Sequence, residues 1–129
     1  MNKAVIELGS NINPGVHILK AMKLISELFR LLGESTFVTT RPIGFKDQSD
    51  FLNGAVLVST DLTRHEFETT LKDIEISMGR RPSDFRFGPR IIDLDLIVWN
   101  GRIVGQDFYE RDFVRNAVLE LLPELQKFT

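Results

Sequence analysis

The sequence predicts an α+β fold, a ferredoxin-like split βαβ sandwich in which helices cover one face of an antiparallel sheet. The predicted element order is strand, helix, strand, strand, helix, strand, which is the order of a split βαβ unit. The helical segments repeat apolar residues every three or four positions, whereas the strand segments alternate or are rich in β-branched residues. At 129 residues the chain suffices for one hydrophobic core, so we expect a single domain over residues 1–129.

The first half of the chain contains the first helix and three strands. KAVIEL, residues 3–8, alternates as a strand does, and GSNINPG then supplies turn residues. An amphipathic helix is predicted over residues 16–32, stopped by Gly33. Its apolar stripe consists of Ile18, Met22, Ile25, Phe29 and Leu32. TFVTT predicts a second strand, RPIGFKDQSD a long loop and FLNGAVLVST a third strand.

The second half begins with a helix whose start is marked by Thr63 and Glu66 at capping-box spacing. The apolar stripe of this helix is Phe67, Leu71, Ile74 and Met78, and the helix ends before Gly79. GRRPSDFRFGPR predicts a loop, IIDLDLIVW the fourth strand, and RDFVRNAVLELLPEL a short last helix. We expect the face of the sheet opposite the helices to be free for ligand or loops.

Composition excludes several classes of protein. The chain has no cysteine, so it forms neither disulfides nor thiolate metal sites. No apolar run has the length of a membrane helix, and the first residues start a strand instead of a leader segment. A net charge of −2 argues against general binding of nucleic acids. We expect a cytoplasmic protein, monomeric or weakly oligomeric, without membrane or nucleic-acid partners.

Two acidic residues, Asp93 and Asp95, interrupt the apolar fourth strand. Alternate residues of a strand point the same way, so both carboxylates leave one face while Ile92, Leu94 and Leu96 leave the other. Two close carboxylates raise each other's pKa and require a compensating cation. Mg²⁺ held by one or two carboxylates and completed by waters and phosphates is one solution. The alternative is an exposed strand end whose acids pair with nearby arginines.

The loop before these acids is strongly basic, with Arg80, Arg81, Arg86 and Arg90 against the single acid Asp84. Arginine binds phosphate oxygens through two parallel N–H groups and stays charged. Clustered arginines beside a carboxylate pair therefore favour a metal-bound polyphosphate. The alternative is a solvated loop in which two arginines pair directly with the aspartates. A loop of this kind is also able to close over a substrate.

A second constellation lies at the start of the third strand, where Phe51 and Asn53 face the same way. A planar heterocycle would stack on the ring, and the amide would recognise its edge by donating and accepting hydrogen bonds. The alternative is a core phenylalanine beside an asparagine that satisfies loop backbone.

The motif Gly88-Pro89-Arg90-x-x-Asp93-Leu94-Asp95-Leu96-Ile97 resembles the signature of the 6-hydroxymethyl-7,8-dihydropterin pyrophosphokinase family. Collinear similarities extend over nearly the whole chain, which makes the resemblance far more specific than one Asp-x-Asp. They comprise Leu8-Gly9-Ser10-Asn11, Thr40-x-Pro42-x-Gly44, Gln48-x-x-Phe51-Leu52-Asn53, Glu75 to Arg80, Arg111-x-Phe113-Val114 and Leu121-x-Pro123-Glu124-Leu125.

The resemblance implies transfer of pyrophosphate from ATP, the co-substrate, to the hydroxymethyl group of a reduced pterin, leaving AMP. It implies that Asp93 and Asp95 bind two Mg²⁺ ions and act in catalysis with Arg80 and Arg90. The residues expected on the ATP side are Glu75, Arg80, Arg86, Arg90 and Arg111. Those expected around the pterin are Thr40, Pro42, Ile43, Phe51, Asn53 and Phe113, with the two rings forming a sandwich. Such phosphoryl-type chemistry depends on positioning and charge neutralisation.

The sequence departs from the family pattern in three places. IVGQDFYERDF lacks the proline-histidine pair that usually precedes the C-terminal arginine, and the segment reads as shortened. Pro82 stands where a second loop arginine is usual, unless Arg81 replaces it, and Phe87 stands for the usual tryptophan. These differences favour an alternative, a catalytically weak pterin- or nucleotide-binding protein. A third reading, an RNA-binding sheet of this topology, ranks last because Asp93 and Asp95 would repel a phosphate backbone.

Overall fold

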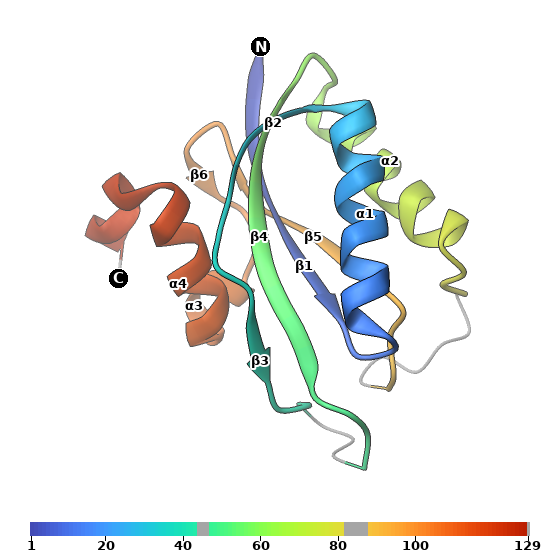
Figure 1. The fold of residues 1–129 in the computed structure, drawn as a ribbon. Helices are drawn as coiled ribbons and strands as arrows, with labels where there is room; N and C mark the ends of the chain where they lie inside the picture. The colour runs from blue at the N-terminus through green and yellow to red at the C-terminus, as the bar shows by residue number, and fades with distance from the viewer. Residues whose placement is uncertain (44–46, 82–87, 129) are drawn as a thin grey trace.

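A computed structural model describes residues 1–43, 47–81 and 88–128, and in this part of the chain one antiparallel sheet lies between two helical layers (Figure 1). The strands are β1 (Asn2–Ser10), β2 (Arg30–Glu34), β3 (Val38–Thr40), β4 (Phe51–Thr60), β5 (Asp93–Trp99) and β6 (Arg102–Ile103). The helices are α1 (Pro14–Leu28), α2 (Arg64–Ser77), α3 (Asp107–Glu110) and α4 (Asp112–Leu121), followed by the 3₁₀ helix η1 (Pro123–Phe128).

The strand order confirms the predicted α+β fold. The sheet runs β2-β4-β1-β5-β6. β3 pairs with the start of β4, on the same side of β4 as β2. β1 is central and antiparallel to both β4 and β5, as the split βαβ arrangement requires. Between β1 and β5 the register shifts, because Val5 faces Val98 whereas Ile6 faces Leu96. The C-terminal end of β1 and the starts of β4 and β5 lie together at one end of the sheet.

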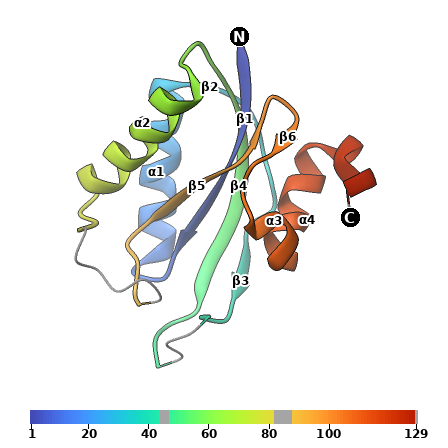
Figure 2. The ribbon, with the colours of Figure 1, turned by 180° about the vertical axis from the view of Figure 1, so that it is seen from behind.

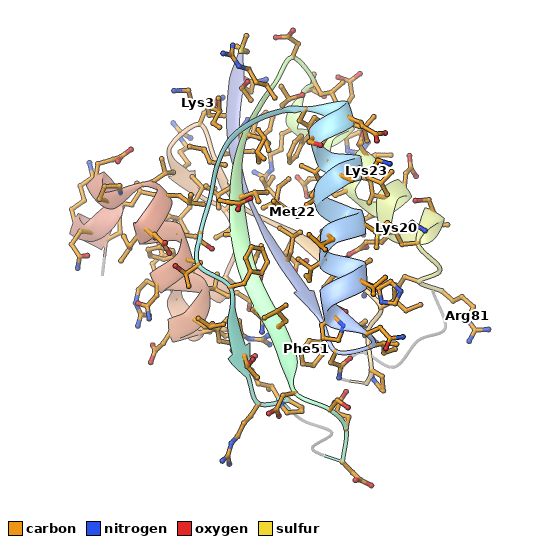
Figure 3. The ribbon with its side chains drawn as sticks, viewed as in Figure 1. Lys3, Lys20, Met22, Lys23, Phe51 and Arg81 are labelled. Carbon is orange, nitrogen blue, oxygen red and sulfur yellow. The ribbon has the colours of Figure 1, made fainter. Side chains whose placement is uncertain are left out.

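One face of the sheet packs on α1 and α2, seen from the other side in Figure 2. Alternate β1 residues Ala4, Ile6 and Leu8 enter this core and are at most 1% exposed. Phe67 of α2 lies at its centre, with ring centroids 4.7 Å from Phe29 and 5.5 Å from Trp99. On the outer side of α1, Lys20 and Lys23 point to solvent (Figure 3). The amphipathic pattern of both helices is confirmed.

The predicted end of the first helix is wrong. α1 ends at Leu28, and Phe29 is extended, with φ −132° and ψ 161°. Residues 30–34 then form β2, which the prediction missed, and pair with β4. The extended backbone keeps the Phe29 ring against Phe67, while the next residues form hydrogen bonds with the edge of β4. Leu32 therefore lies outside the helical stripe and is 41% exposed.

The expectation that helices cover one face only is also wrong. Val114, Ala117 and Val118 of α4 pack on the opposite face of the sheet. The sheet contributes Val5, Ala55, Ile97 and Val98 to this second cluster. The physical reason is that this half of the face is apolar and needs cover. The remaining half stays open. Within the described residues, no helix is long and apolar enough to cross a membrane.

Candidate active site

The open half of the second face forms a pocket of about 510 Å³. It lies beside α3 and the start of α4, over the ends of β1, β4 and β5. Its lining residues are Glu7, Gly9, Thr40, Arg41, Ile43, Phe51, Asn53, Arg80, Gly88, Arg90, Asp93, Asp95, Asp107, Arg111, Phe113 and Val114. The pocket therefore joins an acidic group, several arginines and two aromatic rings.

The register of the sheet brings the acids together. Gly9 of β1 lies between Asn53 and Asp93, and Glu7 lies between Ala55 and Asp95. Cross-strand partners point to the same face, so Glu7, Asp93 and Asp95 all face the pocket. Leu94, 5% exposed, points to the α1/α2 core. The predicted division of this strand into an acidic and an apolar face is confirmed.

Asn11 holds the loops around the pocket in place. Its backbone N–H donates to the Arg90 carbonyl at 3.1 Å, and its side-chain oxygen accepts from the Arg90 backbone N–H at 2.7 Å. Its Nδ2 donates to Oε1 of Gln48 at 2.8 Å and to the Ser49 carbonyl at 3.0 Å. Because Asn11 is 6% exposed, these bonds link the segments before β4 and β5 to the end of β1.

Arg80 connects two acids. Its Nη1 donates to Oε2 of Glu75 at 2.8 Å and lies 2.7 Å from Oδ1 of Asp93. Oε2 of Glu75 also accepts from the Leu94 backbone N–H at 2.7 Å, which ties α2 to β5. Glu75 is 7% exposed and does not line the pocket. It acts as a positioning residue for Arg80.

Three further arginines line the pocket, and two of them, Arg90 and Arg111, lie close to aspartates. Arg90 is 4% exposed, and its Nε lies 3.6 Å from Oδ1 of Asp93. This Nε has no hydrogen-bond partner among the described residues. Arg111 lies across the pocket, with its Nε 3.5 Å from Oδ1 of Asp107 on α3. Both arginines line the pocket, and each also lies near an aspartate.

Burial and crowding alter the acids. Although Asp95 keeps part of its surface exposed to solvent, desolvation by the surrounding protein, and then the charges of Asp93 and Glu75, raise its pKa to about 7. Burial likewise raises the pKa values of Asp93 and Glu75, against the lowering effect of Arg80. Among the described residues, ion pairs within 4 Å involve Asp93 and not Asp95. Within the part of the chain that the structure describes, direct pairing with arginine accounts for Asp93 only, and a further cation near Asp95 would offset its negative charge.

Aromatic and amide groups line the opposite end. Phe51 lies where β4 begins (Figure 3), and Phe113 lies near the start of α4. Both rings are half-buried and line the pocket, so Phe51 is not a core residue. Asn53 is 6% exposed and donates through Nδ2 to the Thr40 hydroxyl at 2.5 Å. An added Cβ on Gly9 would lie 2.6 Å from Oδ1 of Asn53, so glycine permits this close approach.

Most residues expected at the site meet in this pocket. They are Thr40, Ile43, Phe51, Asn53, Arg80, Arg90, Asp93, Asp95, Arg111 and Phe113. Pro42 is buried beside the pocket and, like Glu75, does not line it. Arg86 lies outside the described residues, as do Gly44, Pro82 and Phe87.

Sequence reasoning missed three charged lining residues, Glu7, Arg41 and Asp107. Glu7 carried a usable signal, because it is an acid within a buried strand, as Asp93 and Asp95 are. Asp107 belongs to α3, the short helix in the segment that lacks the proline-histidine pair.

The chain belongs to the 7,8-dihydro-6-hydroxymethylpterin-pyrophosphokinase (HPPK) family, whose profile matches residues 5–123. Pocket, fold and sequence thus point to the same class of enzymes, the pyrophosphokinases.

Curated relatives carry matching names. The 2-amino-4-hydroxy-6-hydroxymethyldihydropteridine pyrophosphokinase of Methylorubrum extorquens is 33% identical over 136 residues, which cover 97% of this chain and 85% of the relative. Its Bacillus subtilis counterpart is 31% identical and matches over 98% of this chain and 81% of its own length. A folate synthesis bifunctional protein of Arabidopsis thaliana is 33% identical over 93% of this chain, which spans only 27% of that protein.

Proposed function

We propose that this chain transfers the pyrophosphoryl group of ATP to the hydroxymethyl group of 6-hydroxymethyl-7,8-dihydropterin in folate biosynthesis, in a magnesium-dependent reaction. The observation that carries the proposal is the pocket in which Asp93 and Asp95 meet four arginines and an aromatic-amide group. Family membership supports the reaction class, and the pocket chemistry supports the assignment of roles.

The acidic end fits Mg²⁺. Asp93 and Asp95 offer hard oxygen ligands on one face of β5 and line the same pocket. Two carboxylates leave coordination positions for water and phosphate oxygens. Bound there, Mg²⁺ would neutralise phosphate charge and bring ATP to the acids. The resemblance to the family favours two ions.

The arginines bind and orient the phosphates. Arg80 is held by Glu75, and the backbone N–H of Arg90 donates to the Asn11 side chain; both guanidinium groups lie beside Asp93. Arg111 faces them from the start of α4. In this arrangement the pterin hydroxyl oxygen attacks the β-phosphorus of ATP and its proton passes to solvent, while the bond from that phosphorus to the α-phosphate oxygen breaks and AMP leaves. The arginines stabilise the charge that develops on the transferred and departing phosphates.

The aromatic end binds the pterin. Phe51 and Phe113 stack on the two faces of the ring, and the oxygen of Asn53 accepts from an N–H at its edge. The bond from Asn53 Nδ2 to Thr40 fixes the amide in this orientation. Ile43 adds an apolar side chain to the lining, next to the buried Pro42.

A second candidate function is binding of pterin or nucleotide with weak turnover. It is favoured by the segment that lacks the proline-histidine pair, where Asp107 pairs with Arg111 at 3.5 Å. An acid in contact with Arg111 competes with an ATP phosphate for the same guanidinium group.

The test is AMP formation from ATP and Mg²⁺, with and without 6-hydroxymethyl-7,8-dihydropterin. We expect wild type to form AMP only with pterin, and Asp95→Ala to lose at least about a hundredfold in rate, the scale of a removed electrostatic stabiliser. Asp73→Ala is the matched control, because Asp73 is exposed on α2 away from the pocket.

Pterin-dependent AMP in wild type and in Asp73→Ala, lost in Asp95→Ala, would support the proposal. Full activity in Asp95→Ala would overturn the metal assignment. Pterin binding without any AMP would favour the second candidate.

A further inference from the structure

The short helix α3 carries an acid that contacts a pocket arginine. Asp107 and Arg111 both line the pocket, and Oδ1 of Asp107 lies 3.5 Å from Nε of Arg111. The Arg111 backbone N–H also donates to the Asp107 carbonyl at 3.0 Å, so a single helical turn sets the spacing of the two residues. The proposed reaction gives Arg111 a phosphate to bind and leaves Asp107 without a role.

The backbone that carries α3 is fixed on β5. The Gly105 N–H donates to the Ile97 carbonyl at 3.1 Å. A Cβ added to Gly105 would lie 2.7 Å from Cδ1 of Ile97 and 2.9 Å from the Leu96 carbonyl oxygen, so glycine permits this close packing. Phe108 of α3 is 0% exposed and belongs to the second apolar cluster. The acid on α3 therefore has a fixed place beside the pocket.

The contact leaves most of the Arg111 guanidinium without a partner. It involves Nε, and among the described residues neither Nη group forms a hydrogen bond. The side chains of Arg111 and Asp107 are 32% and 30% exposed, and a pair of this kind is weak. A phosphate bound by both Nη groups forms shorter, charge-assisted bonds of about 2.7–2.9 Å. Asp107 is thus placed to orient Arg111 without displacing a phosphate from it.

We propose that Asp107 is a positioning residue for Arg111, which it holds beside the pocket before nucleotide binds, so that the Nη groups are ready to receive a phosphate of ATP. The inference rests on the proposed function, since it assumes that phosphates reach Arg111. An arginine side chain is flexible, and holding it in place beforehand lowers the entropic cost of binding. The fixed backbone of α3 provides the support that this requires.

Positioning and competition predict opposite effects. If Asp107 competes with the phosphate for Arg111, its removal strengthens nucleotide binding. If Asp107 positions Arg111, its removal weakens nucleotide binding, and only while Arg111 is present. A purely structural role of the Asp107 side chain in α3 predicts a lower unfolding midpoint and a loss of pterin affinity as well.

The experiment is a double-mutant cycle on nucleotide affinity, measured by calorimetry with α,β-methylene-ATP and Mg²⁺. The chains are wild type, Asp107→Ala, Arg111→Ala, the double variant and Asp107→Glu. The control is Asp112→Ala, which removes the same charge from the neighbouring Asp112–Arg115 pair outside the pocket. We expect Asp107→Ala to bind the analogue about tenfold more weakly, and to have no such effect when Arg111 is already alanine. Asp107→Glu should keep part of the affinity, and Asp112→Ala should match wild type.

A loss in Asp107→Ala that disappears in the Arg111→Ala background, with pterin affinity and unfolding midpoint unchanged, would support the inference. Tighter binding in Asp107→Ala would overturn it in favour of competition. Unchanged binding, an equal loss in both backgrounds, or a parallel loss of pterin affinity and stability would overturn it as well. A wild-type protein that does not bind the analogue would do the same, whereas the proposed function is tested separately by pterin-dependent AMP formation.

Discussion

Alternate residues of β1 enter two different environments. On the α1/α2 face, Ala4, Ile6 and Leu8 meet apolar side chains and are fully buried. On the opposite face, Val5 joins the α4 cluster, but Glu7 and Gly9 line a charged pocket. Apolar burial stabilises by about 25 cal/mol per Å², whereas a buried acid without a partner destabilises. The same strand thus separates stability from ligand binding by the direction of its side chains.

The largest expected effect is the loss of stability from a substitution on the apolar face of the sheet. Phe67→Ala removes a ring that is 0% exposed and contacts Phe29 and Trp99, and should lower the free energy of unfolding by about 3–5 kcal/mol. Phe113→Ala is the control on the pocket face, where the ring is half-buried and the loss should be much smaller. Denaturant unfolding compares the two variants. Equal losses would mean that the pocket face stabilises the fold as strongly as the core does.

A smaller change tests the pocket face. Gly9→Ala places a methyl group 2.6 Å from Oδ1 of Asn53, so the amide must move. We expect pterin affinity to fall about tenfold, because misplacing a binding group by a fraction of an ångström is enough to weaken it. Fluorescence titration with the pterin measures this. Gly15→Ala is the control, since nothing lies within 4 Å of a Cβ added there. Unchanged affinity in Gly9→Ala would exclude Asn53 from the pterin site.

The pH dependence of stability distinguishes the pocket face, which carries Asp95, from the apolar face. Asp95 has a folded-state pKa of about 7, above its usual value of 3.8, so between these values the folded state binds more protons than the unfolded state. The contribution of Asp95 to stability therefore falls as pH rises from about 4 to about 7. We expect Asp95→Asn to remove part of this decline, measured by unfolding midpoints with a chelator present. Parallel wild-type and Asp95→Asn profiles would contradict the raised pKa.

The smallest effect concerns the start of α2. The Thr63 hydroxyl accepts from the Glu66 backbone N–H at 3.2 Å, and Oε1 of Glu66 accepts from the Thr63 N–H at 2.9 Å. Thr63→Ala breaks this capping box and should cost about 1 kcal/mol in unfolding free energy. Because the cap lies outside the pocket, pterin and nucleotide affinity should stay at wild-type values. A change in either affinity would couple the helical face to the site.

Much of the site was predictable from short stretches of sequence. The period of a strand places Asp93 and Asp95 on one face, and the spacing of Thr63 and Glu66 marks a helix start. The period of a strand also placed Phe51 and Asn53 on one face. Beyond those local patterns, the similarity to the family extended the expected site to Thr40, Arg111 and Phe113, which also line the pocket.

Other features depended on contacts between distant segments. The helix predicted to reach Leu32 ends at Leu28, because pairing with β4 and packing of Phe29 on Phe67 outweigh the local apolar period. α4 covers the second face because Val5, Ala55 and Val98 meet there, although they come from three strands.

By itself, the order of residues determined which side chains share a face of each strand or helix, since that follows from the backbone period. Only the tertiary structure decided which faces meet. It set Glu7 opposite Asp95 and put one arginine, Arg80, between Glu75 and Asp93, because strand register and helix packing determine distances between segments far apart in the chain.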